Sequence, residues 1–331
     1  MRFAFFSVRH DACGGCRLHV DLMNELCARG HEVFYGLPFY LVDRPFWTPC
    51  VARRVSAMDL PRMGRFDAVV FSHADGYCGG FPLSPLVRAC DAGRRFFLLR
   101  SFLPVHVGVV QDEGLEVVAT SRWVAEMAEF YGRCGAAAGG RVVRVFGGVN
   151  LSRFCGGTGR CNERPVVLVR ESLDTIKGTA AVAEGLGLLR GRGFDFEVAV
   201  LRGSEREVRE LYRRADVFVS GEVEWGLGWS SVVGEAMACG CAVVCTGVRA
   251  VEHLAEDGVT ALVFAPGDGE GMADAVGWLL RDAGLRCGLA EAGRRRVVRY
   301  STERMAVRLE ESVQGPRSKV QGQESELNIE H

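Results

Sequence analysis

Lysine is almost absent from the sequence. Only Lys177 and Lys319 occur, beside 38 arginines. Lysine offers a compact point charge on a flexible stem, whereas arginine presents a rigid planar fork. Lys177 stands directly before Gly178, where a helix is expected to begin. Its presence in a chain that otherwise uses arginine makes Lys177 a candidate site residue, and the alternative explanation is chance.

Long apolar runs and an excess of one charge are also missing. No run approaches the roughly 18 residues that a membrane-spanning helix needs. The formal net charge of −1 gives no electrostatic reason to expect nucleic acid as a partner. The opening residues MRFAFFSVRH are typical of a strand between charges, not of a secretory signal. We expect a cytoplasmic protein that touches the inner membrane surface at most peripherally.

Motifs that hold metals or dinucleotides are absent as well. The sequence contains no D-x-D pair of carboxylates, and Cys13 and Cys16 form the only C-x-x-C among thirteen cysteines. No second pair completes a zinc site. Gly14 and Gly15 follow the first expected strand, but they are not the G-x-G-x-x-G of dinucleotide dehydrogenases. We expect neither a metal nor a bound cofactor.

Alternating strands and helices are expected over most of the 331 residues, and a chain of this length suffices for two domains. The stretch 217–246 shows the pattern best. Continuous apolar runs at 217–220 and 242–246 are typical of parallel strands covered on both faces. Ser230 or Ser231 is expected to cap the helix between them, and Gly240 is expected to end it in a left-handed conformation.

The residues Gly-Glu-Ala-Met-Ala-Cys-Gly at 234–240 resemble the E-A-M-A-C-G-x-P-V-V signature of family 4 glycosyltransferases. That family consists of retaining enzymes with the GT-B fold. The resemblance implies an α/β protein with two Rossmann-like domains, whose parallel sheets face each other across a cleft. It also implies that Glu235 holds the ribose hydroxyls of a nucleotide-sugar donor.

The chain departs from this family at Leu227. The family carries a second glutamate there, eight residues before the first, and the resemblance assigns donor binding to the loop Leu227, Gly228, Trp229, Ser230, Ser231. Glu222 and Glu224 lie nearby but out of register. Two accounts remain open: the donor sugar is less polar at that point, as in a deoxysugar, or Glu224 reaches in as a catalytic residue.

Other segments extend the resemblance. Gly14 and Gly15 match the turn that lets backbone N–H groups approach the donor phosphates. Arg170 and Lys177 resemble the R-x(4)-K-G pair on the donor diphosphate, here seven residues apart instead of five. Fixed cations can replace a metal in stabilising a leaving diphosphate. The resemblance therefore implies metal-independent chemistry in which Arg170 and Lys177 are catalytic.

Two features have competing interpretations. His73 ends an expected strand, and the resemblance places it beside the sugar, in a catalytic position; a histidine at a strand end is otherwise a structural residue. The segment 38–65 mixes aromatic residues, prolines and arginines. It is interpreted either as a loop for an acceptor or a membrane surface, or as a packed irregular connection.

The predicted organisation follows the family. Residues 1–150 are expected to form the acceptor domain and 151–299 the donor domain. Residues 300–313 are expected to form a helix that packs back across the cleft, and 314–331, which are polar, a disordered tail.

The predicted function is a retaining transfer of sugar from a UDP- or GDP-linked donor to a glycan, lipid-linked or small-molecule acceptor. The alternative is a catalytically silent GT-B protein that binds a nucleotide sugar or a partner without transfer. Leu227 and a short donor domain favour the alternative; Glu235 with Arg170 and Lys177 favours the enzyme.

Overall fold

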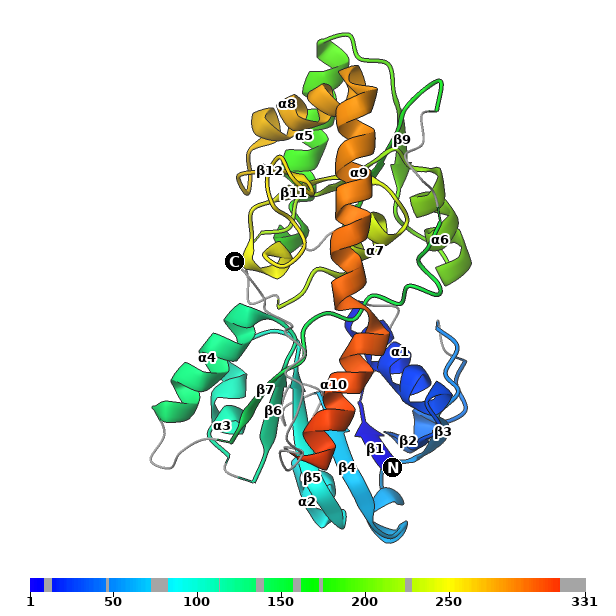
Figure 1. Cartoon of the computed structure of the whole chain (residues 1–331), viewed down its shortest axis with the longest axis vertical. Helices are drawn as coiled ribbons and strands as arrows, with labels where there is room; N and C mark the ends of the chain where they lie inside the picture. Colours follow the sequence, from blue (N-terminus) through cyan, green and yellow to red (C-terminus); the bar gives the residue numbers. More distant parts are fainter. Residues whose placement is uncertain are drawn as a thin grey trace, which may run out of the picture.

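The computed structural model describes residues 1–8, 14–45, 48–72, 83–112, 114–134, 140–156, 162–172, 175–223 and 228–315. They form two α/β lobes, one above the other in Figure 1, each built on a parallel sheet. The predicted fold class is thereby confirmed.

The N-terminal lobe contains seven strands among the described residues, in the spatial order β3-β2-β1-β4-β5-β6-β7. All the pairings are parallel. The strands are β1 (Arg2–Phe6), β2 (Glu32–Leu37), β3 (Arg53–Ser56), β4 (Phe66–Phe71), β5 (Ala92–Leu99), β6 (Glu116–Ala119) and β7 (Val142–Arg144). The helices are α1 (Gly14–Ala28), α2 (Leu83–Ala89), α3 (Val107–Val110) and α4 (Arg122–Arg133).

The central strands are apolar on both sides because both faces of the sheet are covered. One face, with Phe3 and Phe5, packs against α1 and α10 (Thr302–Gln314). The other face, with Phe6 and Phe71, packs against residues of α2, α3 and α4. Burial on two faces explains the continuous apolar runs that predict these strands.

The C-terminal lobe has five strands in its described part, in the order β12-β11-β10-β8-β9, again all parallel. The strands are β8 (Val166–Val169), β9 (Glu197–Val200), β10 (Val217–Ser220), β11 (Ala242–Thr246) and β12 (Leu262–Phe264). The helices are α5 (Thr179–Gly191), α6 (Glu205–Arg214), α7 (Ser231–Ala238), α8 (Gly269–Arg281) and α9 (Ala283–Val297). Residues of α6 and α7 pack on one face of this sheet, and those of α5 and α8 on the other.

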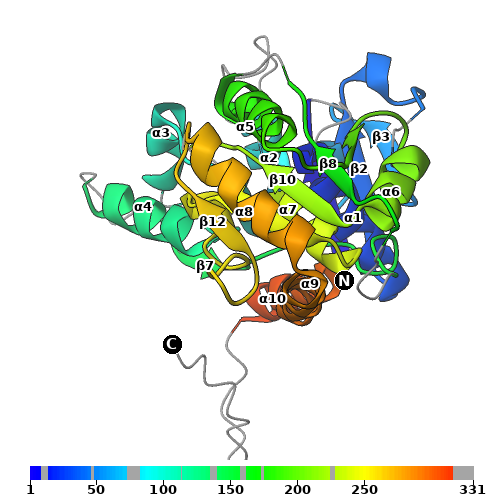
Figure 2. The same cartoon turned by 90° about the horizontal axis from the view of Figure 1, so that it is seen from above.

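The chain crosses between the lobes twice. The first crossing follows β7, where Gly147 and Gly148 have φ angles of 97° and 126°. The second runs from α9 through Tyr300 into α10, which descends along the N-terminal lobe beside α1 (Figures 1 and 2). The two crossings contact each other, since the Gly148 and Val149 N–H groups both donate to the Tyr300 carbonyl at 3.0 Å. A side chain at Gly147 would collide with the Tyr300 backbone.

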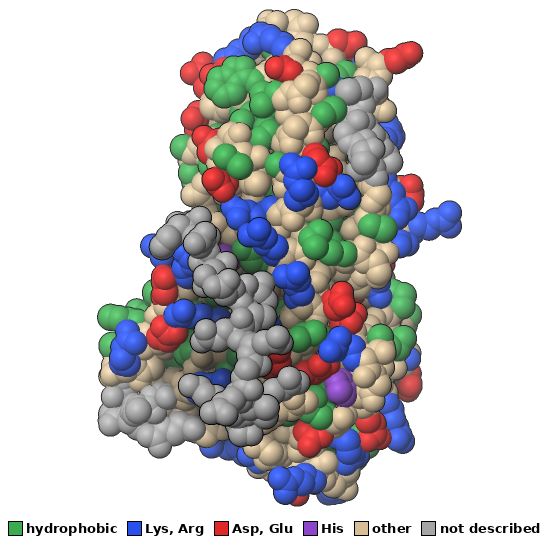
Figure 3. Space-filling model, viewed as in Figure 1, with side chains coloured by type: hydrophobic (Ala, Val, Ile, Leu, Met, Phe, Trp, Pro, Cys, Tyr) green, Lys and Arg blue, Asp and Glu red, His purple; other side chains and the backbone are tan. Residues whose placement is uncertain are grey.

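The face that carries α9 and α10 has basic and acidic side chains interspersed over both lobes (Figure 3). Several form pairs, such as Arg294 with Glu291 and Arg296 with Glu256. Within the described residues, no helix has the length and apolar character to cross a membrane.

Two local expectations change. Helix α1 begins at Gly14, so Gly14 and Gly15 form its first turn and not a turn before it. The segment 38–65, in its described part, contains the edge strand β3 and two short 3-10 helices, Phe39–Leu41 and Leu60–Arg62. An edge strand that is half exposed lacks the apolar run by which the central strands are recognised.

Candidate functional site

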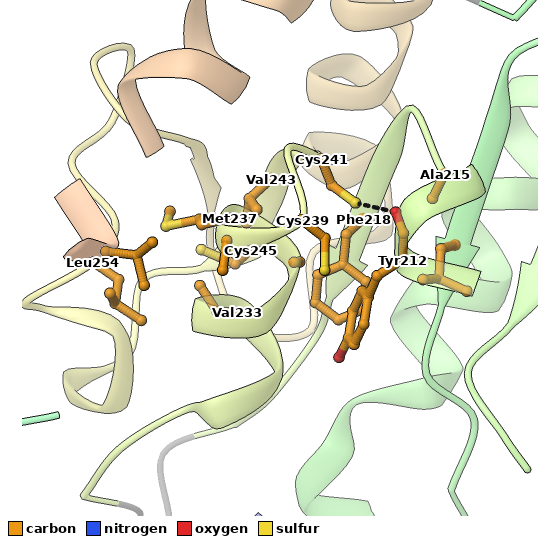
Figure 4. Packing of buried hydrophobic residues seen from close by; sticks show 14 of the residues in the cluster. Tyr212, Ala215, Phe218, Val233, Met237, Cys239, Cys241, Val243, Cys245 and Leu254 are labelled. Carbon is orange, nitrogen blue, oxygen red and sulfur yellow. Dashed lines mark hydrogen bonds between the residues drawn. The ribbon is translucent and has the colours of Figure 1, made fainter. Parts of the chain in front are cut away.

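Helix α7 places Glu235 at the junction of the lobes. The helix follows β10 and precedes β11, and Val233 and Met237 pack it into the core with Phe218 and Val243 (Figure 4). Glu235 lies in its second turn and is only 3% exposed. The helix ends at Ala238, with Cys239 as its C-cap, and Gly240 follows with φ 83°, the left-handed conformation that the sequence predicts.

Arg17 from the other lobe forms an ion pair with Glu235. Its Nη2 contacts Oε1 of Glu235, and the side chains are 8% and 4% exposed. The second carboxylate oxygen, Oε2, is buried without a hydrogen-bond partner among the described residues. Such an oxygen is an acceptor that a ligand hydroxyl would satisfy.

Glu222 gathers the two predicted diphosphate cations. Its Oε1 accepts from Lys177 Nζ at 3.0 Å and from Arg170 Nη1 at 3.4 Å. Its Oε2 accepts from the Ser230 hydroxyl at 2.7 Å. Glu222 is 3% exposed, and a buried carboxylate requires such partners. One anion therefore holds two cations, which leaves this cluster with a surplus positive charge.

This arrangement corrects the expected role of Ser230. Ser230 occupies the N-cap position of α7, but its side chain caps no backbone N–H. Its hydroxyl donates to the Glu222 carboxylate instead, because a hydrogen bond to a charged acceptor is the stronger one. In the sequence, Glu222 is out of register with the family's glutamate. Its position directly after β10, level with the cations that follow β8, is the signal that indicates it.

A close backbone contact holds Lys177 in place. Gly178 has φ 63°, and an added Cβ there would strike the carbonyl of Gly221. The Val223 N–H donates to the Ile176 carbonyl at 2.9 Å. The loop after β8 therefore lies on the loop after β10, which brings Lys177 to Glu222. Only glycine fits at 178.

The N-terminus of α1 lies against the N-terminus of α7. A Cβ at Gly14 would overlap the Ser231 hydroxyl, and a Cβ at Gly15 would overlap the Arg100 guanidinium. Helix N-termini carry unpaired N–H groups and a partial positive charge. Two such ends thus meet beside Arg100, at the carboxyl ends of both sheets, in an arrangement suited to an anion.

The described end of the predicted donor loop also joins the lobes. The Gly228 N–H donates to the Arg100 carbonyl at 3.0 Å. The Trp229 ring stacks with His253 at 6.3 Å and contacts Tyr300 at 5.5 Å between centroids. Trp229 Nε1 is buried and finds no acceptor among the described residues. Three predicted residues, His73, Glu224 and Leu227, lie outside the described residues.

His253 and Glu252 bind the N-terminus of α4 across the junction. The Arg122 N–H donates to His253 Nε2 at 2.9 Å, and the Trp123 N–H to Glu252 Oε1 at 3.3 Å. Burial lowers the pKa of His253 to about 4, helped by the charges of Arg122 and Arg296. The imidazole is therefore neutral and can accept this hydrogen bond.

Two parallel-sheet lobes that meet at the carboxyl ends of their strands, with a final helix returning to the first lobe, define the GT-B class. Residues 180–282 match the family Glycosyl transferases group 1. Phosphatidyl-myo-inositol mannosyltransferase from Mycolicibacterium smegmatis is 30% identical over 171 residues, which cover 44% of this chain and 44% of that protein. The match thus spans less than half of this relative.

Solved structures show the same fold over nearly the whole chain. Sucrose-phosphate synthase from Thermosynechococcus elongatus superposes with a TM-score of 0.72 at 17% identity, covering 93% of this chain and 97% of that one. Anabaena HepE in complex with UDP-glucose gives 0.69 at 14% identity, covering 95% and 99%. The predicted resemblance to family 4, or group 1, glycosyltransferases is confirmed.

Proposed function

We propose that the protein is a glycosyltransferase that moves a sugar from a nucleotide-sugar donor to an acceptor. The observation that carries the proposal is the junction of the lobes. There two helix N-termini meet beside Arg100, and the Arg170–Lys177 pair lies on Glu222. Glu222 also binds the N-cap residue of α7, and that helix carries Glu235, whose Oε2 is unsatisfied among the described residues. A nucleotide diphosphate has both the negative charge and the ribose hydroxyls that such a junction can bind.

In the proposed reaction, Glu235 accepts a ribose hydroxyl, while Arg170 and Lys177 neutralise the leaving diphosphate. The bond between the sugar C1 and the phosphate oxygen breaks, and the acceptor oxygen bonds to C1 on the same face. The acceptor proton passes to the departing phosphate oxygen, so no protein nucleophile is needed. Fixed charges of this kind stabilise charge that develops in the transition state.

Retention follows from that same-face path. Chemistry without a metal is proposed because the sequence has no D-x-D pair and supplies cations instead. The complexes of HepE with UDP and with UDP-glucose favour a UDP-linked donor over a GDP-linked one. A lipid-linked, glycan or small-molecule acceptor remains the proposed range, and the location proposed is cytoplasmic, at most peripheral to a membrane.

The test measures released nucleotide from a panel of UDP-, GDP- and ADP-sugars, after a thermal-shift screen with UDP, GDP and ADP. We expect one diphosphate to raise the melting temperature and its sugars to be hydrolysed slowly without acceptor. Glu235→Ala should weaken nucleotide binding by at least about tenfold, since a charge-assisted hydrogen bond is lost. Binding without any release would identify the catalytically silent alternative. No binding at all would contradict the proposal.

A further inference from the structure

Arg17 belongs to the N-terminal lobe, yet its guanidinium is buried against the C-terminal lobe. It projects from the first turns of α1, and its Cζ lies 5.0 Å from the centroid of Phe154, a core residue of the other lobe. Burial lowers the pKa of Arg17, and the neighbouring Tyr212, Asp21 and Glu205 act in the opposite direction. Arginine retains its charge even so, and a buried charge requires a fixed partner.

That partner is the carboxylate of Glu235. Arg17 takes Oε1 and leaves Oε2 buried and unsatisfied among the described residues. The terminal torsion of a glutamate is broad, so an unheld carboxylate samples many orientations. A guanidinium on one oxygen removes this freedom and directs the other oxygen.

The surroundings contain a second unsatisfied polar atom. The Tyr212 hydroxyl is fully buried without a partner in the described part of the chain, and it points away from the apolar cluster of α7 (Figure 4). Tyr212 and Glu205 belong to α6, whereas Arg17 and Asp21 belong to α1. The polar groups around Arg17 therefore come from both lobes. They form a cluster only while the lobes are in contact.

We propose that Arg17 is a positioning residue for the donor: it holds Oε1 of Glu235 from the opposite lobe, so that Oε2 alone receives the ribose hydroxyl. This inference rests on the function proposed above. Arg17 touches no part of the nucleotide and acts through Glu235. The N-terminal lobe thereby contributes to recognition of the ribose, and nucleotide affinity depends on contact between the lobes.

Arg153 provides a matched control. It lies in the segment between the lobes, its side chain is 17% exposed, and its Nη1 pairs with Asp21 at 2.8 Å and with Glu205 at 3.4 Å. It thus links α1 to α6 as Arg17 links α1 to α7, and among the described residues its ion pairs are with Asp21 and Glu205 and not with Glu235. Substitution of Arg153 removes an ionic link between the lobes at Asp21 and Glu205 and removes none of the described contacts of Glu235.

The experiment compares the Kd of UDP with that of 2′,3′-dideoxy-UDP by calorimetry, or the corresponding pair for GDP or ADP if the screen favours that base. The parent should bind the ribonucleotide about tenfold more tightly, the effect of one charge-assisted hydrogen bond. In Arg17→Met the ratio of the two Kd values, dideoxynucleotide over ribonucleotide, should fall to about threefold or less, because Oε2 of Glu235 is no longer held. Glu235→Gln should lower it similarly, and Arg153→Met should keep the parent ratio.

The ratio separates positioning from general damage, because a weakened fold affects both nucleotides alike. Arg17→Gln, which keeps a polar side chain, is measured beside Arg17→Met in case the latter fails to fold. A parent that binds both nucleotides equally contradicts the ribose role of Glu235 and with it the proposed function. If the parent prefers the ribonucleotide and the Arg17 variants keep the same preference, only the proposed role of Arg17 is contradicted.

Discussion

At the level of single residues, the site depends on two buried carboxylates, Glu222 and Glu235. Glu222 is stable in this position because Lys177, Arg170 and Ser230 all donate to it. Truncation of one partner in such a cluster leaves a charge uncompensated, which costs more than the pair contributes net. Arg170 is 33% exposed and Lys177 only 12%. Lys177 is therefore the less replaceable cation.

Replacement of Lys177 by Ala should lower kcat about 100-fold, with a smaller rise in KM, because a fixed charge on the leaving diphosphate is lost. Initial rates of nucleotide release at varied donor concentration measure both constants. Arg192→Ala is the control, since Arg192 lies at the end of α5 and pairs with Asp274. Its rate should stay within about twofold of the parent, as for most surface changes.

The affinity of the Lys177→Ala variant for a nucleoside shows whether Lys177 acts on the phosphate groups. A nucleoside without phosphates should bind the Lys177→Ala variant and the parent alike. Loss of nucleoside affinity in the variant would show instead that Lys177 supports the local fold.

At the scale of elements, helix α4 receives part of its N-terminal capping from the other lobe. Ser121 accepts from the Val124 N–H within the helix, while His253 and Glu252 accept from Arg122 and Trp123. Unpaired N–H groups in the first turn need such acceptors. A helix end that is capped across a junction makes the contact between the lobes sensitive to the charge of the cap.

The free energy of unfolding should therefore depend on His253 in acid. Its pKa is about 4 in the folded protein, below the roughly 6.5 of an unfolded chain, so the neutral form is favoured by folding. The stabilisation is complete above pH 6.5 and is lost as the pH falls towards 4. The loss amounts to about 2–3 kcal/mol.

Urea unfolding of the parent and of His253→Gln, at pH 7 and pH 4.5, measures this contribution. Glutamine keeps an acceptor for the Arg122 N–H but does not titrate. The free energy of unfolding of the variant should therefore fall less than that of the parent between pH 7 and pH 4.5. Burial raises the pKa of Glu252 and lowers that of His106 to about 4. Both groups are present in the two proteins, and their effects cancel in the comparison. Equal losses would contradict the prediction.

At the scale of the whole molecule, α10 ties the end of the chain to its beginning. Met305, Ala306 and Leu309 are at most 1% exposed and pack in the core beside α1. At the surface, Glu310 pairs with Arg29 and with His31 at 2.8 Å. The N-terminal lobe is thus completed by residues that follow the C-terminal lobe in sequence.

Two truncations test this arrangement. A chain that ends after Tyr300 loses α10 and should lose on the order of 3–6 kcal/mol of unfolding free energy, the burial energy of Met305 and Leu309. A chain that ends after Gly315 retains every described contact of α10, and its stability should equal that of the parent. Urea unfolding compares the two. Equal stability of the shorter and longer chains would show that α10 is dispensable.

The alternation of buried strands and helices and the placement of Glu235 on α7 are predictable from the sequence alone. These features are local: apolar runs, a Gly at the helix end and a short signature suffice to specify them. The edge strand β3 is not predictable in this way, since its exposed side removes the apolar run. The helical conformation of Gly14 and Gly15 is not predicted from the sequence, because glycines are weak helix formers; in the folded chain Ser231 and Arg100 lie against them.

The pairing of buried charges, by contrast, depends on how the two lobes pack. Glu222 lies outside the family signature, and its pairing with two cations follows from the stacking of the loops after β8 and β10. Arg17 is one of 38 arginines, and nothing in its neighbourhood along the chain indicates a partner in α7. Ion pairs between residues far apart in sequence are fixed by how two sheets and their helices pack, because burial makes each charge dependent on whichever opposite charge that packing brings within reach.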